Sequence, residues 1–220
     1  MKSQVVIGDF GNSLLKVKDN DRVDREELVL PHAVVTISPT DFSKIQSQYG
    51  GTEFGDPSYF SFDDQCFVVG DAAEQYPSLK RLSSTSKYER NYLGALAIGS
   101  LLRLFPEGHD NLKMFVCQPP SDMMYRERQM DAVRGEFEIQ TSGKQKVHYH
   151  IQYVNTYQEP LGGYMNVILD ETGEAYDDVA IKEGRVLILD VGGRVSSVVP
   201  ANPDNPDNMI EYGRADSIHY

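Results

Sequence analysis

Apolar and polar positions alternate through the N-terminal segment as they do in two short strands joined by a turn. Residues 5–7 and 14–17 are rich in aliphatic side chains, and Gly11 and Asn12 lie between them. β-Branched residues favour strands, and a glycine–asparagine pair between two apolar runs is typical of a hairpin turn. The pattern therefore predicts a β-hairpin at the start of the chain.

Short apolar runs bounded by turn residues predict most of the remaining strands. The segments 136–140 and 146–157 alternate apolar and polar residues on either side of the sequence TSGK, which predicts a second hairpin. Further strands are expected at 33–38, 66–69 and 112–117, and a strand-turn-strand unit is expected at 183–199.

Residues 87–105 carry the strongest helical pattern, with apolar side chains around most of the circumference. Gly94 and Gly99 lower the helix propensity of this segment, and we interpret them as points of close packing against a sheet. Pro106 and Gly108 are expected to end the helix. Shorter helices are predicted in the alanine-rich segment after Gly70, in 121–135, which starts with a Ser/Asp cap signal, and in 160–170.

Residues 39–62 contain Gly, Pro, Ser and Asp without clear periodicity, and we expect a loop-rich excursion from the main sheet there. A Pro/Asn/Asp-rich loop is expected to begin the segment 200–220. Strand and helix patterns are mixed along the chain, which predicts an α/β fold.

Composition narrows the class of protein. Hydrophobic residues make up 40% and charged residues 25% of the chain, as in an ordinary globular protein, while the formal net charge is −12. Such an acidic chain is a poor partner for nucleic acids or anionic membranes, so we expect direct binding to neither. No apolar run approaches the about 20 residues of a membrane helix. Cys66 and Cys117 lie in apolar runs without metal-binding spacing, which fits a reducing, cytoplasmic compartment.

Two segments have the same order of residue types. Residues 9–12 (DFGN) and 190–193 (DVGG) each place an aspartate after an apolar strand, then an apolar residue, a glycine and a small residue before a returning strand. Glycine lets backbone N–H groups converge on an anion, and a carboxylate beside it can hold a divalent cation that phosphates also ligate. Two such loops facing each other would clamp a polyphosphate, although the chain contains no GxxxxGK[ST] loop.

The segments 9–16 and 190–197 resemble the first and second phosphate loops of the actin-like ATPases. The order of the segments 66–76, 87–102 and 115–163 is similar to that in bacterial, archaeal and plasmid actin-like segregation proteins. The resemblance covers nearly all of the chain. It implies a ribonuclease-H-like α/β domain over 1–199, with a mixed sheet flanked by helices and a small loop-rich insertion at about 39–65. Residues 200–220 would lead into a second domain that this sequence does not contain.

The resemblance also implies the roles of individual residues, with ATP and Mg²⁺ as the bound groups. Asp9 and Asp190 would organise Mg²⁺ and its waters. The phosphates would be held by Gly11, Asn12, Ser13, Lys16, Gly192, Gly193 and Arg194. The turn YQEPLGG matches the place where a carboxylate or amide orients the attacking water, so Glu159 is the preferred candidate and Gln158 the alternative.

The residues alone leave other interpretations open. Asp9 and Asp190 also fit ordinary turn positions at strand ends, Lys16 fits a solvated strand lysine, and Glu159 fits an acidic residue at a helix N-terminus. Arg194 could contact phosphate or point to solvent. His148 and His150 alternate on a strand without a third ligand nearby, so we expect them on the surface of a hairpin rather than on a metal.

The functional expectation is the N-terminal half of an ATP-binding actin-like protein that self-associates into filaments for plasmid segregation or as a cytoskeletal scaffold. An adaptor protein would link such filaments to DNA. The alternatives are a non-catalytic assembly or capping module with the same fold and a sugar-kinase-like phosphotransferase. We expect little or no ATPase activity from this chain alone, because half of the cleft would hold the phosphates weakly.

Overall fold

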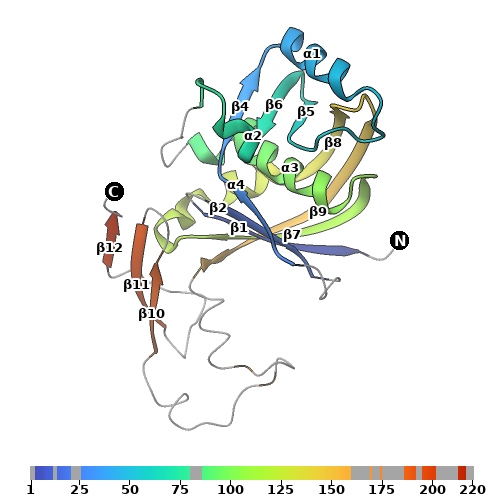
Figure 1. Ribbon diagram of the computed structural model, residues 1–220. Helices are drawn as coiled ribbons and strands as arrows, with labels where there is room; N and C mark the ends of the chain where they lie inside the picture. The colour runs from blue at the N-terminus through green and yellow to red at the C-terminus, as the bar shows by residue number, and fades with distance from the viewer. Residues whose placement is uncertain are drawn as a thin grey trace.

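The computed structural model describes residues 3–11, 14–20, 26–79, 86–159, 169, 174, 186–191, 195–201 and 213–216 of the 220-residue chain. Nine strands form one mixed sheet in the order β3-β2-β1-β7-β9-β8-β5-β6-β4 (Figure 1). The strands are β1 (Gln4–Phe10), β2 (Leu14–Asp19), β3 (Leu28–Pro31), β4 (Val34–Ile37), β5 (Tyr59–Phe62), β6 (Gln65–Val69), β7 (His109–Gln118), β8 (Gly135–Thr141) and β9 (Lys146–Gln158).

The centre of the sheet is parallel and its flanks are antiparallel. Strand β1 pairs with β7 in parallel, and β7 pairs with β9 in parallel, whereas every other neighbouring pair in this sheet is antiparallel. The predicted hairpins β1-β2 and β8-β9 are confirmed. The carboxyl ends of β1, β7 and β9 therefore meet at one edge of the sheet.

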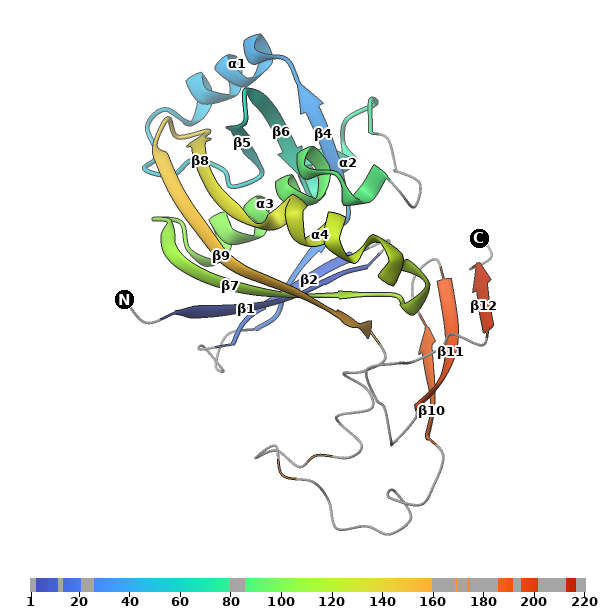
Figure 2. The same ribbon diagram turned by 180° about the vertical axis from the view of Figure 1, so that it is seen from behind.

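Helices α3 (Ala95–Leu104) and α4 (Arg126–Val133) pack on one face of the sheet (Figure 2). A π-helical turn, Arg90–Gly94, leads into α3, so the helix predicted at 87–105 is confirmed over most of its length. The apolar face of α3 and the facing strand residues form the main core, in which Leu96, Ile98 and Leu101 are fully buried. Removing this apolar area from water is the main stabilising term of such a layer.

The two glycines of the helical segment behave as close-packing points. A Cβ placed at Gly99 would lie 2.5 Å from Cγ2 of Val69, which belongs to β6. A Cβ at Gly94 would lie 3.0 Å from the carbonyl oxygen of Ala132 in α4. Close packing against the sheet is thus confirmed for Gly99, whereas Gly94 packs against a helix.

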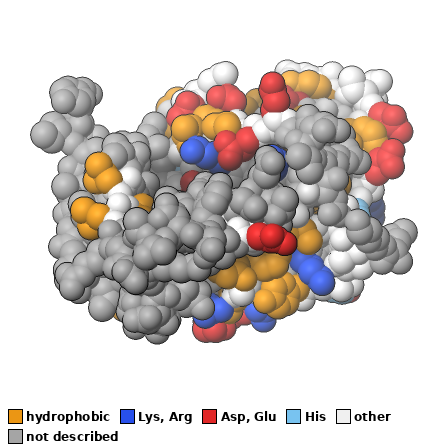
Figure 3. All heavy atoms as spheres, turned by 90° about the horizontal axis from the view of Figure 1, so that it is seen from below, with side chains coloured by type: hydrophobic (Ala, Val, Ile, Leu, Met, Phe, Trp, Pro, Cys, Tyr) orange, Lys and Arg blue, Asp and Glu red, His pale blue; other side chains and the backbone are white. Residues whose placement is uncertain are grey.

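The opposite face of the central strands is exposed. Strand alternation places Ile7 and Tyr153 on this face, and their side chains are 40% and 45% exposed. Leu14, Val29 and Tyr157 are also exposed there. Figure 3 shows hydrophobic side chains beside lysine and arginine side chains on this underside of the molecule. No helix within the described residues is long and apolar enough to span a membrane.

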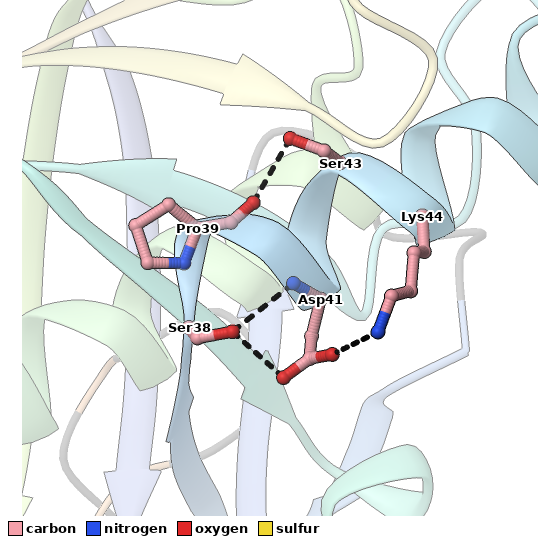
Figure 4. A network of polar contacts seen from close by, with 5 residues as sticks. All are labelled: Ser38, Pro39, Asp41, Ser43 and Lys44. Atoms are coloured by element: carbon pink, nitrogen blue, oxygen red, sulfur yellow. Dashed lines mark hydrogen bonds and ion pairs between the residues drawn. The ribbon is translucent and has the colours of Figure 1, made fainter.

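The prediction of a loop-rich excursion at 39–62 was wrong at both of its ends. Residues Pro39–Tyr49 form helix α1, and β5 belongs to the main sheet, so only 50–58 lacks a helix or strand. The helix escaped detection because Phe42 is its only buried residue, which leaves no apolar periodicity. Its start is fixed by polar contacts instead: Ser38 Oγ accepts a hydrogen bond from the Asp41 backbone N–H at 3.1 Å (Figure 4).

Two further differences concern short elements. Strand β3 was not predicted, since it contains only four residues. The helix expected at 121–135 begins as a 3₁₀ helix, Pro120–Tyr125, and becomes α-helical only at Arg126. At the start of this segment Pro119 is the N-cap residue and makes no side-chain cap hydrogen bond, whereas Asp122 forms a buried ion pair with Lys87. Helix α2 (Asp71–Glu74) is the expected short helix after Gly70.

A second sheet is formed by β10 (Val186–Val191), β11 (Val195–Ala201) and β12 (Gly213–Asp216), all antiparallel. The first two strands match the strand-turn-strand unit predicted at 183–199. In Figures 1 and 2 this sheet lies on the side toward which β1, β7 and β9 point. The helix predicted at 160–170 falls outside the described residues, apart from Leu169.

Candidate functional site

The carboxyl ends of the three parallel strands bring the candidates Asp9 and Glu159 to one edge of the sheet. Asp9 on β1 is in register with Cys117 on β7, and Cys117 is in register with Tyr157 on β9. Glu159 follows β9 directly. Ligands of open α/β sheets bind outside the carboxyl ends of the strands, so this edge is the expected place for a site.

Asp9 and Lys16 face each other across the first hairpin. They are directly opposite in the antiparallel pair β1-β2, which places both side chains on the same face of the sheet. Asp9 is half-buried and Lys16 is exposed. The hairpin therefore presents a cationic side chain beside a partly desolvated carboxylate.

Gly11 brings the turn backbone close to the Asp9 carboxylate. A Cβ placed at Gly11 would lie 3.6 Å from Asp9 Oδ1 and 3.0 Å from the carbonyl oxygen of Leu14. A side chain at this position would crowd the turn, so glycine keeps the backbone within reach of a group bound next to Asp9.

The pKa of the Cys117 thiol is sensitive to the charges at this edge. Burial, followed by the negative charges of Asp9 and Glu159, raises the pKa of the Cys117 thiol to about 12. The thiol is thus kept neutral. The carboxylates of Asp9 and Glu159, from two different strand ends, both raise its pKa. Cys117 is half-buried, whereas Cys66, the other cysteine of the chain, is buried.

The two candidates in the turn after β9 lie in different surroundings. Gln158 is buried and in register with Gln118, whose Nε2 donates a hydrogen bond to Met123 Sδ at 2.8 Å. Glu159 is half-buried, and its charge acts on Cys117 together with that of Asp9. Of the two, Glu159 is the one that shares an electrostatic environment with Asp9.

His32 supports the first hairpin and was missed by sequence reasoning. Its Nδ1 donates a hydrogen bond to the backbone carbonyl of Gly11. The imidazole lies 5.4 Å from the ring of Tyr92, whose hydroxyl donates to the His32 carbonyl at 3.2 Å. A single histidine after a proline carries no periodic signal, so only the three-dimensional structure relates it to the turn.

A buried ion pair holds the segment that follows β7. Lys87 Nζ lies 2.9 Å from Asp122 Oδ2, and the two side chains are 7% and 6% exposed. The Tyr88 hydroxyl donates to the same carboxylate oxygen at 2.5 Å. Because Asp122 lies four residues after Gln118, this cluster fixes the path of the chain as it leaves the candidate site.

The remaining predicted residues lie in β10 or outside the described residues. Asp190 belongs to β10, where it pairs with Ser197, while Asn12, Ser13, Gly192, Gly193 and Arg194 lie outside the described residues. Within the described part of the chain, no group of three or more His, Cys, Asp or Glu could hold a metal ion. His148 Nδ1 lies 2.7 Å from Asp110 Oδ1, and the His148 side chain on the β8-β9 hairpin is 35% exposed.

Comparison with known proteins agrees with this architecture. The apo ParM protein of pSK41 superposes with a TM-score of 0.68 at 18% identity, covering 96% of this chain and 64% of that one. The archaeal actin homologue Ta0583 in complex with ADP gives 0.62 at 15%, covering 93% and 57%. An AlfA filament bound to AMPPNP gives 0.57 at 13%, covering 96% and 70%. A search of the curated proteins finds no match.

The nine-strand mixed sheet with its helices has the fold of an actin-like ATPase domain. The family model of the actin-like proteins N-terminal domain matches residues 8–162, and the chain belongs to this family. The chain spans 64% of the length of the pSK41 ParM chain.

Proposed function

We propose that this chain is the phosphate- and metal-holding part of an ATP-binding, filament-forming actin-like protein. One observation carries the proposal: the strand register brings Asp9 on β1 and Glu159, directly after β9, to the same edge of the sheet, with Cys117 on the strand between them. Carboxylates at the carboxyl edge of a parallel sheet suit two tasks at such a site: Asp9 would hold the hydrated Mg²⁺, and Glu159 would orient the attacking water.

The residues of the first hairpin fit such a complex. Mg²⁺ keeps several waters and prefers oxygen ligands, so the half-buried Asp9 carboxylate would accept hydrogen bonds from those waters. Lys16, opposite Asp9 in the hairpin, would bring a positive charge to the phosphates. Gly11, with Asn12 and Ser13, would offer hydrogen-bond donors, and bound ATP with Mg²⁺ would supply the phosphoanhydride bond that is cleaved.

Glu159 would orient the attacking water as an acceptor of its proton. Its half-buried position and its closeness to the charge of Asp9 favour it over the buried Gln158, which remains the second candidate. Such a role needs positioning and electrostatics rather than covalent chemistry.

The second loop of the clamp would come from the β10-β11 turn. Asp190 would be the second carboxylate near the metal, and Gly192, Gly193 and Arg194 would face the phosphates. The internal likeness of residues 9–12 and 190–193 supports this assignment. The complexes of Ta0583 with ADP and of AlfA with AMPPNP support an adenine nucleotide as the ligand.

We propose that the chain uses the bound nucleotide for its self-association into filaments. The similarity to a protein solved as an AlfA filament supports a filament-forming role in plasmid segregation or as a cytoplasmic scaffold, with an adaptor as the link to cargo. In this proposal residues 1–199 form the first domain, and 200–220 lead into a second one.

Calorimetric titration with ATP, in the presence and absence of Mg²⁺, tests the proposal. We expect Mg²⁺ to strengthen ATP binding to the wild-type chain, and Asp9→Asn to remove that increase, because the amide no longer attracts the hydrated cation. Glu159→Gln should retain binding, since its role lies in orienting water. Asp131→Asn, an exposed carboxylate on α4, is the matched control. A Mg²⁺ effect that survives in Asp9→Asn would refute the assignment.

A further inference from the structure

A groove of about 390 Å³ lies beside helix α1, apart from the site described above. Its lining includes Asp41, Lys44 and Tyr49 from α1, Tyr59 from β5 and Tyr76 from the segment after α2. Three of these five residues are tyrosines, and all three are half-buried. The groove thus combines aromatic walls with one acidic side chain and one basic side chain.

The tyrosine rings are held in place by packing. The rings of Tyr49 and Tyr59 stack with their centroids 6.2 Å apart and their planes inclined by 30°. Tyr59 and Tyr76 also pack against the small apolar cluster centred on Val35 and Val68. Aromatic ring faces carry a negative electrostatic potential that attracts cations within about 6 Å of the centroid.

The negative charge of Asp56 adds to the negative potential at the tyrosine rings. The Tyr49 hydroxyl donates to Asp56 Oδ2 at 3.4 Å, and the Asp56 charge raises the pKa of Tyr49. Burial, and then the neighbouring Tyr76, Asp56 and Tyr49, raise the pKa of Tyr59. The negative charge of Asp56 contributes to both shifts, and that charge favours a cation near the groove.

The lining of the groove already contains an ammonium group, that of Lys44. Lys44 Nζ lies 2.9 Å from Asp41 Oδ1, and Ser38 Oγ donates to the other carboxylate oxygen at 2.7 Å (Figure 4). The Lys44 side chain is 70% exposed, and exposed ion pairs of this kind are weak. A cation delivered from outside can therefore replace Lys44 on Asp41 at little cost.

We propose that this tyrosine groove, formed by Tyr49, Tyr59 and Tyr76 with Asp41, binds an arginine or lysine side chain of a basic segment on another protein. Charge complementarity identifies the occupant. The chain carries a net charge of −12, so a basic segment is attracted over its whole approach. The groove needs no nucleotide, so this proposal stands apart from the ATP-binding proposal and either can fail alone.

NMR titration of the full 220-residue chain with the peptide acetyl-Gly-Arg-Gly-amide tests the proposal. We expect saturable shifts of the Tyr49, Tyr59 and Tyr76 ring signals, and none with acetyl-Gly-Glu-Gly-amide. Tyr49→Leu should weaken binding about fivefold because it removes a ring face, whereas Tyr49→Phe should keep most of it. Lys44→Ala should strengthen binding by removing the internal competitor for Asp41.

Tyr153→Leu is the matched control, because Tyr153 is an exposed tyrosine on β9 outside the groove, and it should bind the arginine peptide like the wild type. Thermal unfolding midpoints confirm that each variant is folded. Equal binding of the glutamate peptide, no binding of the arginine peptide, or equal losses in Tyr49→Leu and Tyr49→Phe would overturn the proposal. Self-association of the chain that disappears in Tyr49→Leu would also overturn it, since the occupant would then be a second copy.

Discussion

Asp9 on β1 lies directly beside Cys117 on β7, in the parallel register of the central sheet. The carboxylate and the thiol therefore share one face at the edge where β1, β7 and β9 end. Burial and the charges of Asp9 and Glu159 raise the thiol pKa to about 12. Cys117 is thus a built-in probe of the charge at the candidate site.

Cys117 should react slowly with iodoacetamide and faster once a neighbouring charge is removed. With a pKa of about 12, its thiolate is roughly one part in 10⁴ at pH 8, and only the thiolate reacts. Asp9→Asn or Glu159→Gln lowers the pKa and should raise the alkylation rate, measured by peptide mass spectrometry. The rate should also rise with pH up to about 12.

Cys66 is the internal control for this measurement. Its pKa is raised by burial, so its alkylation rate should stay the same in both carboxylate variants. An equal increase at Cys66 and Cys117 would indicate unfolding. An unchanged rate at Cys117 in both variants would contradict the electrostatic picture of the site.

Replacing His32 with phenylalanine should loosen the first hairpin. The substitution keeps a ring beside Tyr92 but removes the donor to the half-buried Gly11 carbonyl, and a hydrogen bond of this kind contributes about 0.5–1.5 kcal/mol. We expect lower stability to denaturant and faster amide hydrogen exchange across residues 8–17. Tyr92→Phe, which removes the bond to the His32 carbonyl, should cost less. Exchange that stays unchanged in His32→Phe would show that the bond from His32 to Gly11 does not hold the turn.

Breaking the buried ion pair of Lys87 and Asp122 should be strongly destabilising. Lys87→Met leaves a buried carboxylate without its cation, which costs about 3–5 kcal/mol. Adding Asp122→Leu should recover most of that loss, because the orphaned charge is removed as well. Urea unfolding of the two variants measures the difference. A Lys87→Met variant as stable as the wild type would mean that the pair is not closed in solution.

Gly99→Ala should destabilise the protein although alanine is the better helix former. The helix propensity gain is about 1 kcal/mol, whereas a methyl group 2.5 Å from Val69 forces α3 away from the sheet at a cost of about 1–3 kcal/mol. Thermal unfolding of Gly99→Ala and of the double variant Gly99→Ala/Val69→Ala distinguishes the causes. Relief of the defect in the double variant identifies overpacking, and no relief argues against it.

Sequence patterns predicted the elements whose burial is periodic. The β1-β2 hairpin, the segment around α3 and the β8-β9 hairpin all bury one side of a regular repeat, so their apolar positions are visible in the chain. Helix α1 was missed because it buries only Phe42 and is set by a polar cap. Local chemistry, rather than apolar spacing, defines such an element.

For the candidate site as well, the sequence predicted some residues and missed others. Asp9, Gly11 and Lys16 stand close together in sequence, so their shared hairpin could be anticipated. The partners that hold the site come from far along the chain: His32 reaches Gly11, and Lys87 reaches Asp122. Contacts between distant segments leave no local pattern in a single sequence, and only the folded chain reveals them.

The location of the metal–phosphate site is tested most directly by replacing Mg²⁺ with Mn²⁺ during ATP binding and following NMR line broadening along the chain. A paramagnetic ion held at the carboxyl edge of β1, β7 and β9 should broaden the amide signals of Asp9, Gly11, Cys117 and Glu159, and Asp9→Asn should abolish the effect. Signals of α1 should stay sharp. Broadening centred elsewhere, or unchanged by Asp9→Asn, would contradict the assignment of this edge as the metal–phosphate site.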